Sequence, residues 1–282
     1  MNKIIDDMDM EAYHDEGSIS STNLSEIAKS CCGNADHKKK NRKNQKQTMP
    51  MFEGNVVHHT LQTKNIGSAY SIAPDVDGRT THGKALKSDH IKECEDRNLS
   101  SITRQQYDMA TGVMESAWSN PESRLFLENG KMERSGFTNL MGVDVKARPD
   151  IDCTHLAHSE HFPALVDIKT RKAGEARADK WKKDFRKYHT YLQAGLQILV
   201  WRELGYEVTE YYYLLVEKEA PYPVNVIPLG KDWIHYSILM THHYLDKWKT
   251  YLGNGLPKGY GKQTPMEMED WQIRMYESIL NV

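Results

Sequence analysis

The sequence has few of the features that mark cysteine-ligated metal sites, membrane spans or secreted proteins. Its four cysteines are Cys31, Cys32, Cys94 and Cys153. They form no Cys-x-x-Cys pair, which argues against a zinc or iron–sulfur site held by cysteines and suits thiols in a reducing cytosol. No uncharged apolar run approaches the ~18–20 residues that span a bilayer, and the acidic N-terminus has no apolar signal-peptide segment. We expect a soluble cytoplasmic protein without a membrane partner.

Positive charge is not in excess either. The chain has 37 lysines and arginines against 39 aspartates and glutamates, so its formal net charge is −2. A polyanionic partner would therefore need basic residues concentrated at one place. The 282 residues can bury a substantial core. We expect a disordered acidic tail over residues 1–17 and, because no linker divides the remainder, a single domain over residues 18–282.

Hydrophobic periodicity predicts alternating helices and strands, hence an α/β or mixed α+β class. The expected helices are Ser18–Ser30, Phe52–Gln62 opening at Gly54, Thr103–Trp118, Trp181–Leu204 and Lys231–Tyr251. Two strand-like runs between Met132 and Thr170 are joined by a polar turn, and Tyr211–Lys218 predicts a buried strand. The basic run His37–Lys46 is either a flexible solvated loop or an arm that contacts phosphates.

Two short motifs place acidic and basic residues where strands would otherwise be apolar: KARPDID (Lys146–Asp152) and LVDIKTRK (Leu165–Lys172). Residues two apart in a strand share a face, so Asp167 and Lys169 point to one side while Val166 and Ile168 pack on the other. Pro149 interrupts a strand ladder just before Asp150. A turn between the strands would bring Asp150 and Asp167 together.

Such a pair of carboxylates favours a bound cation. Carboxylates at close range repel one another, and hard oxygen ligands favour Mg²⁺ or Mn²⁺. A lysine two residues on can balance charge, orient a water or stabilise a pentavalent phosphate. Asp150, Asp167 and Lys169 are therefore the parts needed to hydrolyse a phosphodiester. The Asp-x-Lys triplet by itself is more typical of a surface hairpin with ordinary ion pairs.

The order of motifs resembles the RecB-like branch of the PD-(D/E)XK nucleases, and within it the phage and prophage exonuclease VIII (RecE-type) family. Pro149–Asp150 followed by Asp167–Lys169 matches the superfamily signature, and the resemblance covers nearly everything from Ser18 onward. The further matching segments, in family order, are Ser18–Leu24, Gly54–His58, Glu133 in GKMERSGF, Gln193–Gly195, Val216–Pro221 and Gly255–Gly261. The family often has a tyrosine where this chain has Thr190.

The resemblance implies a restriction-endonuclease-like core, with a central mixed β-sheet flanked by helices, and a set of site residues. His58, Asp150, Asp167 and the backbone carbonyl of Ile168 would bind the metal, and the catalytic set would be Asp150, Asp167, Lys169, Glu133 and Gln193. Three of these have ordinary alternatives: a core histidine at His58, a solvated acid at Glu133 and a buried amide at Gln193. His59 would face away, about 100° around the helix.

Basic residues gather after the second motif. The segment Thr170–Lys187 has eight lysines and arginines against three acids, which favours phosphate contacts and salt-dependent binding. The expected DNA-binding residues are Arg148, Arg171, Lys172, Lys180, Lys182 and Lys183. The aromatic residues in this stretch, Trp181, Phe185 and Tyr188, either stack on bases or belong to the core.

By this resemblance the protein is a Mg²⁺-dependent exodeoxyribonuclease, with Mn²⁺ able to substitute. It would degrade linear double-stranded DNA from the 5′ end and leave 3′ overhangs for recombination by strand annealing. Its partners would be DNA ends, a single-strand annealing protein and copies of itself in a ring, trimer or tetramer. It would act in the cytoplasm of a bacterial host, encoded by a phage or prophage. The alternatives are a RecB-like endonuclease or repair nuclease, and a catalytically silent DNA-binding module.

Overall fold

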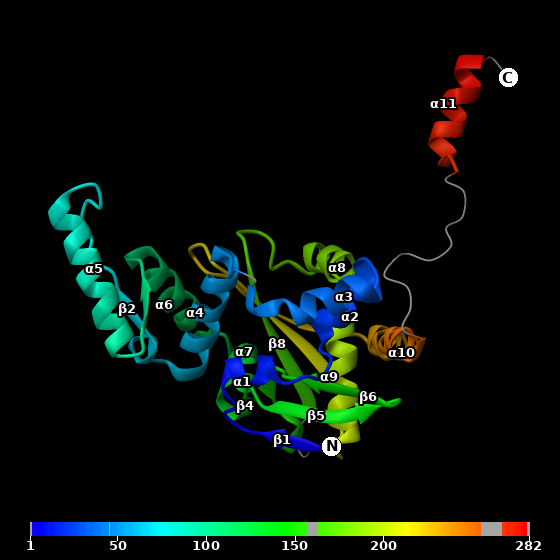
Figure 1. Ribbon diagram of the computed structural model, residues 1–282, viewed down its shortest axis with the longest axis horizontal. Helices are drawn as coiled ribbons and strands as arrows, with labels where there is room; N and C mark the ends of the chain where they lie inside the picture. The colour runs from blue at the N-terminus through cyan, green and yellow to red at the C-terminus, as the bar shows by residue number, and fades with distance from the viewer. Residues whose placement is uncertain (1, 45, 157–162, 255–266, 281–282) are drawn as a thin grey trace.

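The computed structural model describes residues 2–44, 46–156, 163–254 and 267–280. Its main sheet has five strands in the order β10-β9-β8-β7-β4. The strands are β4 (Lys131–Met132), β7 (Ile151–Asp152), β8 (Ala164–Arg171), β9 (Glu210–Glu217) and β10 (Val224–Pro228). β8 and β9 run parallel while the other neighbours are antiparallel. The expected mixed central sheet flanked by helices is confirmed (Figure 1).

A second, antiparallel sheet consists of β1 (Lys3–Ile5), β5 (Ser135–Leu140) and β6 (Val143–Ala147). β5 and β6 are joined through Met141 and Gly142, both with positive φ, as the two-residue turn that suits the twist of a hairpin requires. The same two chain segments continue into the main sheet as β4 and β7. One long hairpin therefore passes from the second sheet into the first.

The two faces of the main sheet bury two separate cores. On one face Leu165 of β8 packs with α2 (Ser21–Lys29), α8 (Ala178–Lys187), α9 (Tyr191–Glu203) and α10 (Lys231–Asn254). On the other face Val166 and Ile168 pack with α4 (Met49–Thr63), α6 (Arg104–Ser119) and α7 (Pro121–Asn129). The alternation predicted for Val166 and Ile168 is confirmed. Residue 167 therefore faces the α9 side.

The position of α9 depends on one glycine. A Cβ on Gly195 would lie 2.3 Å from the carbonyl oxygen of Ser237 on α10, so any side chain here would push the two helices apart. Because the backbones approach this closely, α9 is buried along most of its length. Gln193 is thereby held next to β8.

The remaining elements are peripheral. They are α1 (Met10–Asp15), α3 (Cys32–Lys40), η1 (Arg42–Asn44), η2 (Ile66–Ser68), β2 (Tyr70–Ile72), α5 (Thr81–Asp96), β3 (Ser100–Ile102), η3 (Thr154–Leu156) and α11 (Asp270–Leu280). The short parallel pair β2-β3 and α5 project from one side of the molecule (Figure 1). Within the described ranges, no helix is both long and apolar enough to cross a bilayer.

The disordered tail expected over residues 1–17 is wrong for residues 2–17. β1 pairs with β5, and the Tyr13 side chain is buried, its ring 6.0 Å from that of Phe137. Asp6 forms an ion pair with Arg134 at 2.7 Å. The local sequence is polar, but the unpaired edge of β5 supplies hydrogen-bonding groups that a tail could fill.

Two helix predictions and one loop prediction also change. The helix expected over Trp181–Leu204 is two helices, α8 and α9, because the chain turns between them with His189 at a φ of 56°. The helix expected to open at Gly54 already begins at Met49. Much of the basic run His37–Lys46 lies in α3 and η1, so that part is not a loop. The expected motif Gly255–Gly261 lies outside the described residues.

Candidate active site

The site lies where the long hairpin is interrupted. Glu133 separates β4 from β5 with a left-handed φ of 46°, and Arg148–Asp150 separate β6 from β7. The two interruptions face each other, since the amide of Glu133 donates to the carbonyl of Asp150 at 3.0 Å. Pro149 has no N–H to continue the ladder. The expected break at Pro149 is confirmed, and it leaves the Asp150 side chain free to turn toward β8.

The Asp150 carboxylate replaces a missing backbone partner on β8. β7 pairs with β8 only over Ile151 and Asp152. Beyond that pairing, Oδ2 of Asp150 accepts the amide N–H of Ile168 at 2.5 Å. The acid is therefore part of the fold as well as of the site. No metal contact tests the role expected for the Ile168 carbonyl, which stays a prediction.

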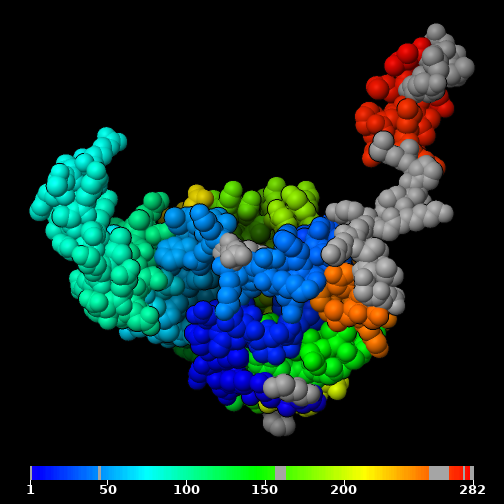
Figure 2. Space-filling model, viewed as in Figure 1, coloured from blue at the N-terminus to red at the C-terminus, as the bar shows by residue number. Residues whose placement is uncertain are grey.

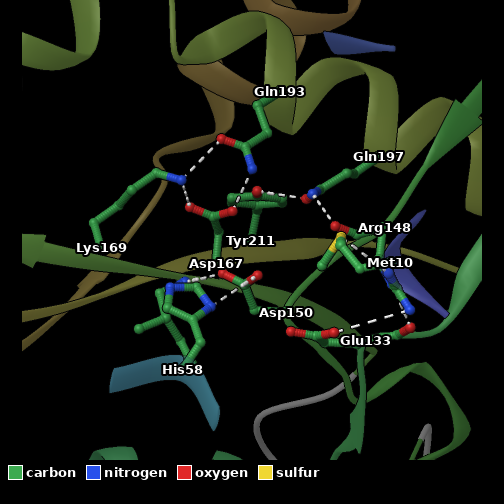
Figure 3. Close-up of polar contacts among 11 residues, drawn as sticks. Met10, His58, Glu133, Arg148, Asp150, Asp167, Lys169, Gln193, Gln197 and Tyr211 are labelled. Atoms are coloured by element: carbon green, nitrogen blue, oxygen red, sulfur yellow. Dashed lines mark hydrogen bonds and ion pairs between the residues drawn. The ribbon is translucent and has the colours of Figure 1, made fainter. Parts of the chain in front are cut away.

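Asp167 is fully buried and has partners from two elements (Figure 3). Gln193 of α9 donates from Nε2 to Oδ1 of Asp167. Lys169 lies on the same side of β8, with Nζ 2.5 Å from Oδ2 of Asp167, and it donates to Oε1 of Gln193 at 3.0 Å. The predicted common face of Asp167 and Lys169 is confirmed. The Gln193 amide links the two charged groups.

The charge of Asp167 is strongly influenced by its surroundings. Its buried Oδ2 has one partner among the described residues, the Lys169 ammonium at 2.5 Å. Burial and the charge of Asp150 together raise the pKa of Asp167 to about 7, against the opposing effect of Lys169. A buried carboxylate beside a second carboxylate favours a bound cation, because the cation offsets the repulsion between the two negative charges.

His58 reaches the site from α4, on the opposite side of the sheet from α9. Its Nδ1 lies 3.5 Å from Oδ1 of Asp150. Burial lowers the pKa of His58, but the charge of Asp150 and its hydrogen bond together outweigh burial, so the pKa is raised. Burial likewise raises the pKa of Asp150, and the opposing effect of His58 leaves it below its ordinary value. His59 faces away as expected, with Nε2 2.8 Å from the Ser68 hydroxyl.

The expected metal ligands are neighbours but do not form a closed ligand set. In the described part of the chain, no three His, Cys, Asp or Glu side chains converge into a group that would hold a metal ion. His58 pairs with Asp150, Asp167 lies against Lys169 and Gln193, and Glu133 is 3.9 Å from Arg148. The carboxylates still fit a divalent cation, since carboxylate oxygens suit Mg²⁺ or Mn²⁺.

The expected DNA-binding residues fall into two groups. Arg148 and Arg171 have side chains 8% and 12% exposed. Arg148 donates to the carbonyls of Met8 and Glu133, while Arg171 pairs with Asp184, so these two guanidinium groups hold the fold together rather than face solvent. The lysines on or before α8 are exposed: Lys172, Lys180, Lys182 and Lys183. Trp181 and Phe185 are buried, which favours the core alternative.

Gln197 and Tyr211 also belong to the site, and neither residue was predicted from the sequence. Gln197 lies one helical turn after Gln193 and donates from Nε2 to the Arg148 carbonyl at 3.0 Å. It accepts from the Tyr211 hydroxyl of β9 at 2.6 Å. These bonds fix the backbone just before Pro149–Asp150. The spacing of two glutamines four apart on an apolar helix was the signal that could have identified Gln197.

Comparisons with known proteins agree on the fold. A family model described as a PDDEXK-like domain of unknown function (DUF3799) matches residues 20–260. Among solved structures, a protein from Eubacterium rectale described as a "putative exonuclease" superposes with a TM-score of 0.59 at 12% sequence identity. That match covers 94% of this chain and 97% of the other. The search of curated proteins found no match.

Proposed function

Because the chain belongs to the family of PDDEXK-like domains of unknown function DUF3799, we propose that it is a metal-dependent exodeoxyribonuclease that degrades linear double-stranded DNA. The observation that carries this proposal is the fully buried Asp167 carboxylate, whose pKa is raised to about 7, in a cluster with Asp150 and Lys169. A domain that only bound DNA would have no need of an ionisable group kept at this energetic cost. The fold shared with a protein described as an exonuclease is consistent with the proposal.

The residues have distinct roles. Asp150, Asp167 and His58 would hold the divalent cation, which when bound supplies positive charge beside the scissile phosphate. Gln193 fixes both the Asp167 carboxylate and the Lys169 ammonium, so it sets the distance between them. Lys169 then positions the attacking water and offsets negative charge on the phosphate. Glu133 would orient Arg148, which lies 3.9 Å away.

Polarity, partners and location are parts of the same proposal. Digestion would start at a 5′ end and leave a 3′ overhang for a single-strand annealing protein, as the resemblance to the exonuclease VIII family implies. The active form would be a homo-oligomer, and the enzyme would act in a bacterial cytoplasm on behalf of a phage or prophage. The exposed lysines of α8 follow directly after β8, which supports their contact with the DNA backbone near Asp167.

A comparison of DNA forms tests the function. We expect linear duplex to disappear in Mg²⁺ or Mn²⁺ and to persist in EDTA, while covalently closed circles survive. Asp150→Asn and Asp167→Asn should each be folded and inactive. Rapid cutting of closed circles would replace the exonuclease with the endonuclease alternative, and no cutting of any form would leave a DNA-binding module. A 5′-end label that outlasts a 3′-end label would reverse the polarity.

A further inference from the structure

A cavity of about 780 Å³ lies between the N-terminal segment and the end of α3. Its walls are residues 13–18, 20–23 and 38–43, and Glu26 of α2 and Lys146 of β6 also line it. Figure 2 shows the recess between the dark-blue N-terminal segment and the lighter-blue segment that contains α3. A backbone bridge between Ile19 and Val145 fixes one wall to β6. The cavity is therefore built by the fold and not by a loose tail.

The lining is strongly basic for a chain of net charge −2. Six lysines and arginines face three carboxylates: Lys38, Lys39, Lys40, Arg42, Lys43 and Lys146 against Asp15, Glu16 and Glu26. Two of those carboxylates are already paired, Glu26 with Lys38 at 2.8 Å and Asp15 with Lys43 at 2.7 Å. Among the described residues, no carboxylate lies within ion-pair distance of Lys39, Arg42 or Lys146. A positive excess remains for an anion.

Lys146 gives the cavity a fixed cation. Its side chain is 4% exposed, and Nζ donates to the backbone carbonyls of Tyr13 and Glu16 at 2.6 Å each and to that of His14 at 3.3 Å. Carbonyls hold the ammonium in place without cancelling its charge. Burial, together with the charges of Arg42 and Lys146, lowers the pKa of His14 to about 4, as a positive environment would.

The cavity lies close to the candidate active site along the chain. Lys146 is the last residue but one of β6 and Asp150 follows four residues later, so their Cα atoms are at most ~14 Å apart. The ring of Tyr13 lies between the two cations, with Lys146 at 4.9 Å and Arg148 at 5.1 Å from its centre. A strand of nucleic acid with one phosphate at Asp150 could therefore place a nearby phosphate in the cavity.

We propose that this cavity binds a backbone phosphate of a single DNA strand, at a position away from the bond to be cleaved. The proposal rests on the proposed function, since it treats the bound strand as the same one that reaches Asp150. Lys39 and Arg42 would contact the phosphate, while Lys146 supplies fixed charge behind them. A single strand suits the site because its phosphates can enter a recess that the stiff duplex cannot follow.

The test is binding of a fluorescent oligothymidylate in EDTA, measured by anisotropy from ~50 to ~200 mM salt. For Lys39→Gln combined with Arg42→Gln, loss of two phosphate contacts should reduce the slope of log affinity against log salt by about 1.4. Neither side chain forms an ion pair that the fold requires. The matched control is Lys84→Gln combined with Lys92→Gln on the projecting α5, which removes the same charge and should leave the slope unchanged.

The possible outcomes test the phosphate site in the cavity separately from the proposed nuclease function. An unchanged slope in the cavity variant overturns the cavity site, and so does an equal decrease in the α5 control, because the effect would then be general attraction. Preferred binding of thymidine 5′-monophosphate over the strand would also overturn it. Since EDTA prevents metal-dependent cleavage, a specific loss in the cavity variant supports the site even if the wild-type protein proves inactive on DNA. That last result would refute only the nuclease.

Discussion

Two buried aspartates of this protein should respond in opposite ways to the loss of their charge. Asp167 and Asp152 are both 0% exposed. Burial and the charge of Asp150 oppose the ionisation of Asp167, whereas Asp152 accepts from Arg134 at 2.7 Å, from the Trp201 indole at 2.9 Å and from the amide of Thr154 at 2.9 Å. We predict that Asp167→Asn stabilises the metal-free protein and that Asp152→Asn destabilises it.

The magnitude for Asp167 follows from its pKa. The folded protein holds this proton up to about pH 7, while the unfolded chain releases it near 3.8. Folding stability therefore decreases as the pH rises through that window, by ~4 kcal/mol in total. Asn at this position removes the ionisation, but its NH₂ would face the Lys169 ammonium, which costs about 1–3 kcal/mol. Asp167→Asn should therefore increase the free energy of unfolding at pH 8 by about 1–3 kcal/mol.

The assay is thermal unfolding between pH 5 and 8 in EDTA and in Mg²⁺. At about 2 °C per kcal/mol for a chain of this size, Asp167→Asn should raise Tm by about 2–6 °C at pH 8 in EDTA. It should also flatten the decrease of Tm with pH. Mg²⁺ at 100 times its dissociation constant should add about 2.7 kcal/mol to the wild type and little to the variant.

Asp152→Asn supplies the contrast. Breaking this buried ion pair leaves the half-exposed Asp6 as the one carboxylate paired with Arg134 among the described residues. We therefore expect a loss of about 3 kcal/mol in the free energy of unfolding, unaffected by Mg²⁺. If Asp167→Asn were less stable than the wild type at pH 8 in EDTA, or kept the same pH profile, the claim that Asp167 carries a penalised charge would be wrong.

Three further predictions concern the neighbours of Asp150. Lys169→Met should abolish turnover while the Mg²⁺ midpoint in a binding titration stays close to wild type; an equal loss of metal affinity would instead make the lysine a structural partner. Because the pKa of His58 is raised by Asp150, protons should compete with the metal for this histidine. The Mg²⁺ concentration that the wild type needs for activity should therefore rise as the pH falls, and His58→Asn should weaken this dependence on pH. Gln197→Leu should cost about 2–3 kcal/mol in urea unfolding and reduce kcat more than KM, since the Arg148 carbonyl and the Tyr211 hydroxyl both lose a partner. An active, fully stable variant would refute that positioning role.

The sequence by itself determined the chemistry of the candidate site. Asp167 and Lys169 are two residues apart in a strand, which places them on one face whatever surrounds them. Pro149 cannot donate to a ladder, so the break beside Asp150 follows from its covalent structure. The family membership that these motifs implied at the superfamily level is borne out over residues 20–260.

Only the tertiary structure decided which partners surround these residues. His58 approaches Asp150 from one side of the sheet and Gln193 approaches Asp167 from the other, and no spacing along the chain encodes that convergence. The ordered N-terminal segment depends on the free edge of β5, which its own polar sequence does not reveal. The buried Arg148 shows the same limit. From the sequence, a basic residue beside a motif predicts a phosphate contact, but in the fold its guanidinium donates to a backbone carbonyl of the protein itself. Charge and spacing are local properties, whereas burial is set by the whole fold.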